Sequence, residues 1–372
     1  MQRAKRTGRR VKGSDAFDVL RERARRSLTP LSVHIDLTHR CNLNCVHCYI
    51  GPRDFDEIRL PRLREILDEL ARMGTLFVTF SGGEIFLRSD LFALLDYARL
   101  KRFSVKLITN ATLIDRTVVD RLRDYPIYQA GVSVYSLDPV IHDAMTAAPG
   151  SLAKTKAAVE MLAHAGMAVA LKTLITRLNA PSYPALAAWA DSMGPRVNRQ
   201  YDLLVTPRND GVFGPAGLNL DVKSKVAFLK ANRKEGQDQR KVEELETKAP
   251  KRDRGATPCF AGWTGSYIGP SGVVYPCVDW HVACGDVRTQ SFSEIWRDSP
   301  GLASARGLTI AKMAACTKCA LVDTCALCPG INRQETGDAA KPSKLVCGRT
   351  RAFAEAMGRA PGGKPKRRKA AR

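Results

Sequence analysis

Long apolar runs are missing from this chain of 372 residues. No stretch approaches the roughly 20 apolar residues that a membrane-spanning helix needs. The N-terminal segment MQRAKRTGRRVKG is basic and lacks the apolar core of a secretory signal. These absences argue against a membrane span and against export, and we expect a cytoplasmic protein.

Histidine and aromatic residues are also scarce, since the chain has six histidines and 7% aromatic residues. Cysteine, in contrast, occurs eleven times. In a chain without an export signal, so many cysteines favour metal ligation over disulfides. The hydrophobic content of 44% is ordinary for a globular protein.

The net charge of +22 is concentrated at the two ends. Residues 1–29 hold ten Lys or Arg against three acidic residues, and residues 359–372 hold seven basic residues and no acidic one. We expect a mobile basic N-terminal arm over 1–29 and a basic tail over 351–372. Such ends can attract nucleic acid or an acidic peptide. No stacking-aromatic surface or groove-reading motif accompanies them, so we expect no nucleic-acid partner.

Residues 30–208 alternate short apolar runs with amphipathic stretches. This alternation predicts repeated βαβ units on a parallel sheet. Six units are too few for a closed eightfold barrel, so the predicted fold class is α/β, a partial (βα)6 barrel. The expected strands are Leu31–Leu37, Leu76–Ser81, Ser104–Thr109, Ala130–Val134, Ala168–Ile175 and Tyr201–Val205, and the expected helices are Pro61–Ala71, Leu91–Leu100, Asp115–Arg123, Ser151–Ala165 and Pro181–Ser192.

The pattern changes after the predicted barrel. Residues 209–257 are turn-rich and charged, and are expected to bridge two domains. Residues 258–350 hold eight cysteines and a hairpin signal, SYIGPSGVVYPC, and Ser293–Arg297 is expected to be helical. A small α+β domain of this kind needs metal or disulfide staples to fold.

Three cysteines follow the first predicted strand as C-x3-C-x2-C: Cys41, Cys45 and Cys48. A structural zinc takes four ligands, whereas an iron–sulfur cubane held by three thiolates keeps one iron open. The three cysteines could instead share one face of a helix. Asn42 and Asn44 are poor helix-interior residues, and this favours a loop.

The second predicted strand ends in Gly82, Gly83 and Glu84. Functional groups of α/β barrels gather at the carboxyl ends of the strands. Glycines let backbone approach a ligand closely, and a carboxylate can accept from an ammonium group.

These two motifs together resemble those of radical S-adenosylmethionine (SAM) enzymes. The resemblance implies that Cys41, Cys45 and Cys48, with Tyr49 next to them, hold a [4Fe–4S] cluster. It also implies that Gly82, Gly83 and Glu84 bind the amino group of SAM. In that family the reduced cluster cleaves SAM to methionine and a 5′-deoxyadenosyl radical.

Two further strand ends resemble the same family. Thr109-Asn110-Ala111 is similar to its Thr-Asn-Gly segment, with Ala111 in place of glycine. Ser133, before Tyr135, is similar to the serine that reaches the ribose. A plain strand-end turn remains an alternative for Asn110 and Ser133.

The other eight cysteines resemble the SPASM extension of this superfamily, which carries two auxiliary [4Fe–4S] clusters. The resemblance implies that one cluster takes Cys259, Cys277 and Cys328. Cys284 is left over and is expected to be the fourth ligand, with a free thiol or an open iron as alternatives. This chain departs from the SPASM pattern in one spacing, because two residues instead of the usual three separate Cys325 from Cys328. One or two zinc sites are the rival interpretation. The second cluster is expected to take Cys316, Cys319, Cys325 and Cys347, giving three clusters in all.

Several polar residues are candidates for acting on a substrate. Asp279 and His281 could move a proton, and Tyr135 and Lys172 lie at or near predicted strand ends. In sulfatase maturases with this extension, an aspartate follows the cysteine of the Tyr-Pro-Cys segment. Val278 occupies that position here, which disfavours this activity.

We therefore expect an enzyme that abstracts hydrogen from a ribosomally made peptide or protein and forms a crosslinked or otherwise oxidised product. An electron donor such as flavodoxin or ferredoxin is implied. About 29 residues are too few for a leader-recognition module, so a separate leader-binding protein is expected. Haem or quinone cofactor biosynthesis, anaerobic sulfatase maturation and, as a non-enzyme, a zinc-dependent nucleic-acid-binding protein are the alternatives.

Overall fold

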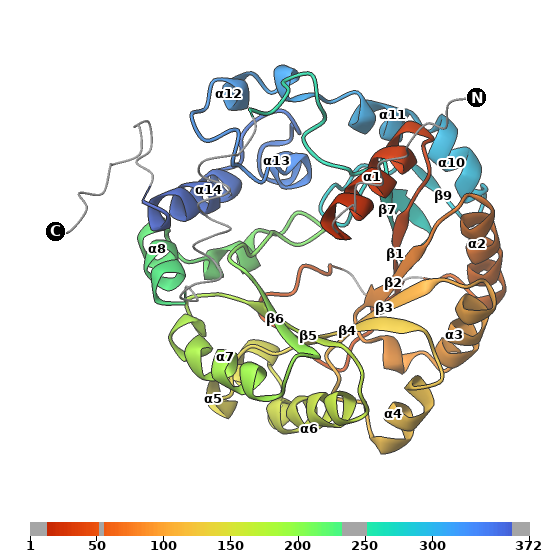
Figure 1. The fold of residues 1–372 in the computed structure, drawn as a ribbon, viewed down its shortest axis with the longest axis vertical. Coiled ribbons are helices and arrows are strands. Elements are labelled where there is room, and N and C mark those ends of the chain that lie inside the picture. The colour runs from red at the N-terminus through yellow and green to blue at the C-terminus, as the bar shows by residue number, and fades with distance from the viewer. Residues whose placement is uncertain (1–12, 52–55, 233–250, 359–372) are drawn as a thin grey trace, which may run out of the picture.

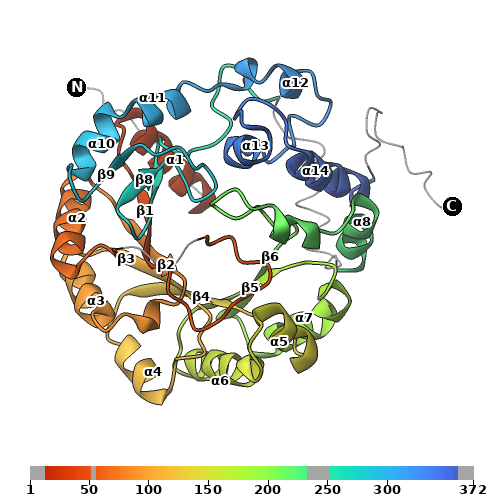
Figure 2. The ribbon, with the colours of Figure 1, turned by 180° about the vertical axis from the view of Figure 1, so that it is seen from behind.

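The computed structural model describes residues 13–51, 56–232 and 251–358. Within them, nine strands form one curved sheet in the order β6-β5-β4-β3-β2-β1-β7-β8-β9 (Figures 1 and 2). The strands are β1 Ser32–Thr38, β2 Phe77–Gly82, β3 Ser104–Thr109, β4 Ile127–Ser133, β5 Val169–Leu174, β6 Val197–Asp202, β7 Gly265–Ile268, β8 Val273–Tyr275 and β9 Gly285–Asp286.

Strands β1 to β6 are parallel, and helices cover their outer side, which confirms the predicted partial barrel (Figure 1). The sixth strand differs from its prediction, because β6 covers Val197–Asp202 instead of Tyr201–Val205. Its residues are mostly polar, so the apolar run just after it gave the stronger signal. The helices of this part are α2 Leu60–Arg72, α3 Leu91–Leu100, α4 Arg116–Leu122, α5 Pro139–Thr146, α6 Ser151–His164 and α7 Tyr183–Ser192.

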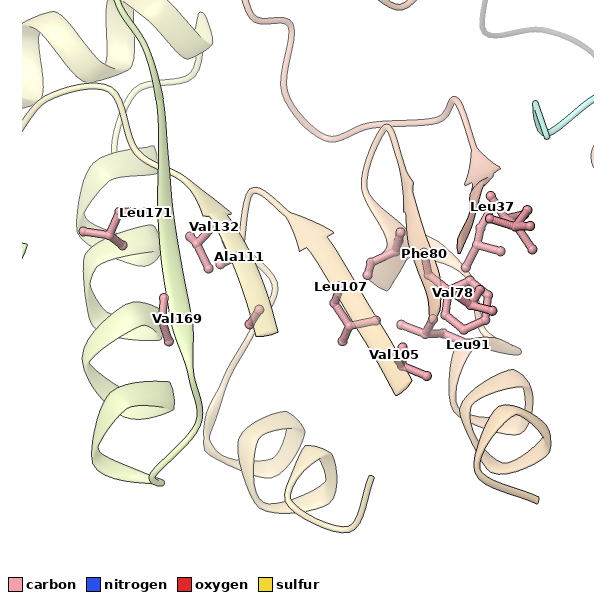
Figure 3. Packing of buried hydrophobic residues seen from close by; sticks show 14 of the residues in the cluster. Leu37, Val78, Phe80, Leu91, Val105, Leu107, Ala111, Val132, Val169 and Leu171 are labelled. Carbon is pink, nitrogen blue, oxygen red and sulfur yellow. The ribbon is translucent and has the colours of Figure 1, made fainter. Parts of the chain in front are cut away.

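The core lies between the strands and the outer helices. In β3, Val105 and Leu107 are buried and alternate with half-buried residues. Figure 3 shows them beside Val78, Phe80 and Leu91. Burying each such large side chain stabilises the fold by roughly 1.5–3 kcal/mol. Because side chains of a strand alternate between its faces, the polar residues between them face the inner, concave side of the sheet.

The predicted hairpin is present, but it belongs to the barrel sheet. Strand β7 pairs with β1 in parallel, and β8 and β9 continue antiparallel. The hydroxyl of Tyr267 on β7 donates to Asp36 on β1 over 2.9 Å. The cysteine-rich segment is therefore joined to the barrel through the first strand.

Residues 13–29 do not form the mobile arm that we expected. Helix α1 covers Gly13–Arg26, and Ala24 in it is buried. The indole of Trp296 donates to the Leu28 carbonyl over 2.6 Å, and the Arg21 guanidinium lies 4.3 Å from the centre of the Phe260 ring. These contacts hold the segment against the C-terminal part of the chain. Residues 1–12 of the expected arm lie outside the described residues.

Helices α10 to α14 lie in the cysteine-rich part of the chain (Figure 2). Leu204, Ile310, Met313 and Ile331 form a second buried cluster there with Cys316 and Cys325. In the bridging segment, α8 (Val222–Ala231) packs against α14 (Lys344–Ala356). Residues 233–250 and 359–372 lie outside the described residues. Among the described residues, no helix is long and apolar enough to cross a membrane. The elements are α8 Val222–Ala231, α10 Phe292–Asp298, α11 Pro300–Arg306, α12 Ala314–Thr317, α13 Pro329–Thr336 and α14 Lys344–Ala356, with short 3-10 helices at Ile85–Leu87, Ala180–Ser182, Gly214–Leu218 and Ile310–Lys312.

Candidate functional site

The segment of residues 41–48, here called the cysteine loop, leaves the carboxyl end of β1 without forming a helix. Its backbone is held from outside, because the amides of Asn44 and Val46 donate to the carbonyls of Thr146 and Met145 at the end of α5 over 3.1 and 3.0 Å. The helix-face alternative for its three cysteines is therefore wrong.

The three thiols of the cysteine loop share one neighbourhood beside Tyr135. Burial first, and then the nearby charges of Cys45, Cys48 and Cys41, raise the pKa of the Tyr135 hydroxyl. The backbone amide of Leu43 donates to the Cys41 sulfur over 3.4 Å. Amide donors of this kind favour the thiolate form that binds metal. The loop thus presents three grouped, half-buried sulfur donors.

The two glycines after β2 lie against the start of this loop. Gly82 has a φ of +129°, and a Cβ there would lie 2.1 Å from the Thr38 carbonyl oxygen. At Gly83 a Cβ would lie 2.2 Å from the Arg40 oxygen, and its amide donates to Thr38. Only glycine permits this approach, which places the β2 end next to the cysteine loop.

Glu84 is completely buried and already bonded within the chain. Its carboxylate accepts from the Thr109 hydroxyl and the Asn110 amide, each over 2.8 Å, and from the Phe86 amide over 3.1 Å. Burial chiefly raises the pKa of Glu84. Its carboxylate joins the ends of β2 and β3. The predicted contact of this side chain with an ammonium group stays a prediction.

The other predicted cofactor residues surround the cysteine loop. The Asn110 amide group lies 3.7 Å from the Cys41 sulfur and donates to Asn42. Ala111, the substitute for glycine, is buried with a φ of +61°, a conformation that favours glycine. Ser133 bonds the Tyr135 hydroxyl, and Tyr49 lies near Cys48, Asp36 and Asp279.

Sequence reasoning missed His47 and a buried polar cluster on β1. His47 is buried with its ring centre 4.4 Å from that of Tyr135, and its Nδ1 has no hydrogen-bond partner among the described residues. Asp36 is fully buried and bonds His34 and Tyr267, each over 2.9 Å. Burial would raise the pKa of Asp36, but hydrogen bonds from His34 and His39 outweigh it and lower the pKa. The sequence signal that could have revealed the buried cluster on β1 was the presence of polar residues at alternate positions of an apolar strand.

Seven of the eight C-terminal cysteines lie in two neighbourhoods. Burial, then neighbouring charges, raise the pKa of the Cys328 thiol to about 12 and that of Cys316 to about 11. In each case other cysteines of the same neighbourhood contribute. We call these the first thiol group, Cys259, Cys277 and Cys328, and the second thiol group, Cys316, Cys319, Cys325 and Cys347.

Backbone amides donate to the sulfurs in both groups. Cys259 accepts from the Ala261 amide and Cys277 from the Asp279 amide. In the second thiol group, Cys319 accepts from the Leu321 amide over 3.4 Å. These sulfurs accept hydrogen bonds from backbone amides, as thiolate ligands of an iron–sulfur cluster do. In the described part of the chain, no three His, Cys, Asp or Glu side chains converge to hold a single metal ion.

Cys284, the expected fourth ligand of the first auxiliary cluster, has different surroundings. Its thiol is 8% exposed, belongs to the main apolar core and donates to the Val282 carbonyl over 3.2 Å. A Cβ at Gly301 would lie 2.9 Å from its sulfur. Burial raises its pKa to about 11. The structure does not place Cys284 with the first thiol group.

Three of the predicted substrate residues have the following surroundings. His281 bonds the Val278 carbonyl over 2.7 Å, so it does not pair with Asp279. Burial and then Asp202 raise the pKa of Asp279 to about 6. Lys172 lies on the concave side, with its Cδ 3.1 Å from the position of a Cβ on Gly131, and burial lowers its pKa.

Comparison with known proteins identifies the family. Residues 35–179 match the family model of the radical SAM superfamily, and residues 259–329 match that of SPASM, an iron–sulfur cluster-binding domain. The mycofactocin maturase MftC of Mycobacterium ulcerans (strain Agy99) is 31% identical over 309 residues, which cover 80% of this chain and 82% of that protein. This chain belongs to the radical SAM superfamily.

Two more proteins resemble this radical SAM chain. The AdoMet-dependent heme synthase of Methanosarcina barkeri (strain Fusaro / DSM 804) is 27% identical over 332 residues, covering 83% of this chain and 94% of that one. The crystal structure of Streptococcus suis SuiB bound to the precursor peptide SuiA has a TM-score of 0.67 at 15% identity, covering 93% and 84% of the two chains. The SuiB similarity extends the radical SAM fold assignment through the cysteine-rich segment.

Proposed function

We propose that this radical SAM protein modifies a ribosomally synthesised peptide or protein by abstracting hydrogen and leaving a crosslinked or otherwise oxidised product. The similarity to mycofactocin maturase, which covers 80% of the chain, carries the proposal. The presence of SuiA in the SuiB structure supports a peptide substrate for this architecture.

The cysteine loop would hold the first [4Fe–4S] cluster through Cys41, Cys45 and Cys48. With SAM bound, this cluster would supply the 5′-deoxyadenosyl radical. The chain's contribution is positional: Gly82 and Gly83 bring the β2 backbone to the loop, and Glu84 fixes it to β3. Asn110 lies at the Cys41 sulfur, where it would border the bound cofactor.

The two thiol groups would hold two auxiliary clusters, giving three in all. Such clusters could accept the electron released when a substrate radical is oxidised. Tyr135 and Lys172 would face the substrate on the concave side of the barrel. His281 is bonded to Val278, and it would act on a proton only after leaving that carbonyl.

The proposed partners follow from this chemistry. Reduction of the first cluster needs a donor such as flavodoxin or ferredoxin, and a separate leader-binding protein would present the peptide. We propose a cytoplasmic location. The proposed division of the chain is a barrel over 30–208, a bridge over 209–257 and an auxiliary-cluster region over 258–350.

The test is anaerobic reconstitution followed by iron analysis and single-turnover chemistry. About twelve irons per chain are expected. Dithionite and SAM should then yield 5′-deoxyadenosine, and short peptides encoded beside the gene should raise its yield and change in mass by loss of hydrogen. The Cys41→Ala, Cys45→Ala, Cys48→Ala triple variant is the control: it should lose about four irons and all 5′-deoxyadenosine.

One alternative has its own support, since the heme synthase similarity spans 94% of that protein. The same assay with an iron porphyrin in place of peptide distinguishes the two. Stimulation by the porphyrin alone would replace the peptide proposal. A product containing formylglycine from a sulfatase peptide would identify a sulfatase maturase. Bound zinc without iron would contradict the enzyme proposal altogether.

A further inference from the structure

His34 and Asp36 lie two positions apart on β1 and form a hydrogen-bonded pair on the concave side of the barrel. We propose that His34, held by Asp36, is the base that takes the proton lost from the peptide during its oxidation. This inference rests on the proposed function and adds a catalytic residue to it.

Oxidation of the peptide removes a hydrogen atom, an electron and a proton. The hydrogen atom would leave in 5′-deoxyadenosine, and the electron would pass to an auxiliary cluster. The proton is released when the carbon radical forms its new bond and the N–H, O–H, S–H or C–H bond of the second reacting group breaks. A side chain with a free lone pair has to accept this proton.

Asp36 fixes the orientation and the tautomer of the His34 ring. Its buried carboxylate accepts from the Tyr267 hydroxyl and lies at His34 Nε2, each over 2.9 Å. Against the effect of burial, hydrogen bonds from His34 and His39 lower the pKa of Asp36, so this carboxylate is ionised and can only accept. Nε2 of the neutral His34 ring therefore carries the proton, and Nδ1 carries the lone pair. In the described ranges 13–51, 56–232 and 251–358, Nδ1 of His34 has no hydrogen-bond partner.

His34 is the accessible member of the pair. Its side chain is 25% exposed, whereas that of Asp36 is 0% exposed. Both alternate along β1 with Val33 and Ile35, which belong to the core behind the sheet, so the exposed part of the His34 ring opens to the concave side. The Tyr267 ring, edge-on to that of His34 with the ring centres 5.4 Å apart, is itself buried. A peptide on this side would therefore reach His34 and not Asp36 or Tyr267.

The strand that carries the pair leads to one proposed cluster, and its neighbouring strands lead to another. The cysteine loop begins five residues after Asp36. On the other edge of β1, His34 stands opposite Tyr267 of β7, which in turn stands opposite Tyr275 of β8. Cys277 of the first thiol group follows two residues after Tyr275. The connections from His34 therefore run to the proposed radical source on one side and to the proposed electron acceptor on the other.

A carboxylate partner also favours the protonated ring that results from the transfer. Once Nδ1 takes a proton, the bond from His34 to Asp36 joins an imidazolium to a carboxylate, and charge-assisted bonds of this kind are about twice as strong as neutral ones. His281 bonds a neutral group instead, since its ring donates to the Val278 carbonyl over 2.7 Å. The contact with Asp36 therefore favours His34 over His281 as the proton acceptor.

The test uses the reconstituted full-length chain, dithionite, SAM and the short peptide encoded beside the gene. His34→Gln should keep about twelve irons and still form 5′-deoxyadenosine, because radical formation does not use the base. Oxidised peptide should fall about a hundredfold. His164→Gln is the matched control, because His164 is exposed on α6 and bonds the Glu160 carbonyl over 2.7 Å. This control should leave the yields of both products unchanged.

A second readout does not depend on turnover. In ¹⁵N-histidine NMR of the reconstituted, oxidised protein in alkaline buffer, the ring signal that disappears in His34→Gln should show a proton on Nε2 and none on Nδ1. Asp36→Asn brings an NH₂ group to this ring, so it should move the proton towards Nδ1 and lower the yield of oxidised peptide while 5′-deoxyadenosine persists.

Oxidised peptide at the wild-type level from His34→Gln, loss of iron in that variant, or a proton on Nδ1 of His34 in the wild-type chain overturns the inference. An unchanged ring signal in Asp36→Asn overturns the role of Asp36. Absence of oxidised peptide from the wild-type reaction would instead refute the proposed function, and the role of His34 with it.

Discussion

Glu84 belongs to a motif predicted to bind the cofactor, and its side chain is hydrogen-bonded within the chain. The sequence predicts that this carboxylate accepts from an ammonium group. In the structure its two oxygens accept from three donors, the Phe86 amide, the Asn110 amide and the Thr109 hydroxyl, whose single proton lies between both oxygens. Hydrogen bonds of this kind set the relative position of the β2 and β3 ends. The bonds that the structure shows for Glu84 are therefore ones that hold the backbone around the site.

Glu84→Gln tests this role. Replacing one oxygen with an NH₂ group brings a donor against a backbone amide, and leaving a buried donor unpaired costs about 1–3 kcal/mol. We expect the free energy of unfolding to fall by this amount in anaerobic urea denaturation of the reconstituted protein. Glu160→Gln, which removes only a surface ion pair with Lys156, should cost less than about 0.5 kcal/mol. Equal effects of the two variants would contradict a structural role for Glu84.

For some predicted site residues the structure shows surroundings that the sequence does not reveal. Counting eleven cysteines as three, four and four made Cys284 a ligand, but a count does not reveal that its sulfur lies in the apolar core. Asp279 and His281 are two positions apart, yet His281 turns to the Val278 carbonyl. The residue type shows what a side chain can bind. The direction in which the side chain points depends on packing against segments that are distant in the sequence.

At the scale of single elements, the carboxyl end of β2 leaves no room for a side chain. Gly82→Ala would put a methyl group 2.1 Å from the Thr38 carbonyl oxygen, on a backbone with φ +129°. Since both the overlap and the backbone conformation are unfavourable, we expect at least about 2 kcal/mol of destabilisation.

The measurement for Gly82→Ala is iron content together with the thermal midpoint. The first cluster should be depleted at least twofold because β1 and β2 are forced apart at the cysteine loop, while auxiliary iron is retained. Gly217→Ala is the matched control, because a Cβ there meets nothing within 4 Å and its φ is not positive. Its midpoint should change little. Undisturbed iron in Gly82→Ala would show that the turn tolerates a side chain.

Most barrel elements could be predicted because each buried parallel strand is an apolar run followed by a turn. This held for β1 to β3 and failed for β6, whose exposed residues Asn198 and Gln200 give no apolar signal. The hairpin of β7 and β8 was predicted from its Gly-Pro-Ser-Gly turn. Its pairing with β1 was not, because the choice of neighbour depends on contacts between Tyr267 and Asp36, 231 residues apart.

At the scale of the whole molecule, the barrel and the cysteine-rich segment share one sheet. Besides the β1–β7 pairing, Arg62 of α2 donates to the Gln290 carbonyl over 2.9 Å, and Trp296 bonds Leu28. Such contacts couple the two parts energetically, because neither can unfold without exposing a strand edge of the other.

We therefore expect one cooperative unfolding transition in calorimetry of the reconstituted protein. Tyr267→Phe, which removes a buried donor to Asp36, should shift that whole transition downwards, by about 1–3 kcal/mol in stability. Tyr128→Phe, at a position 43% exposed on β4, should not shift it. Two separate transitions, of which only one responds to Tyr267→Phe, would show that the parts fold independently.

The position of β7 beside β1 also has a consequence for biosynthesis. During translation β1 is made before β7, the strand that covers its second edge, which follows more than two hundred residues later. Until then the nascent chain carries an open strand edge and an Asp36 without its tyrosine partner. Pairings of such long sequence separation form slowly and leave the growing chain exposed to aggregation. Completion of the barrel therefore awaits synthesis of the cysteine-rich segment, and production of this protein is expected to depend on how well its unfinished chain is protected on the ribosome.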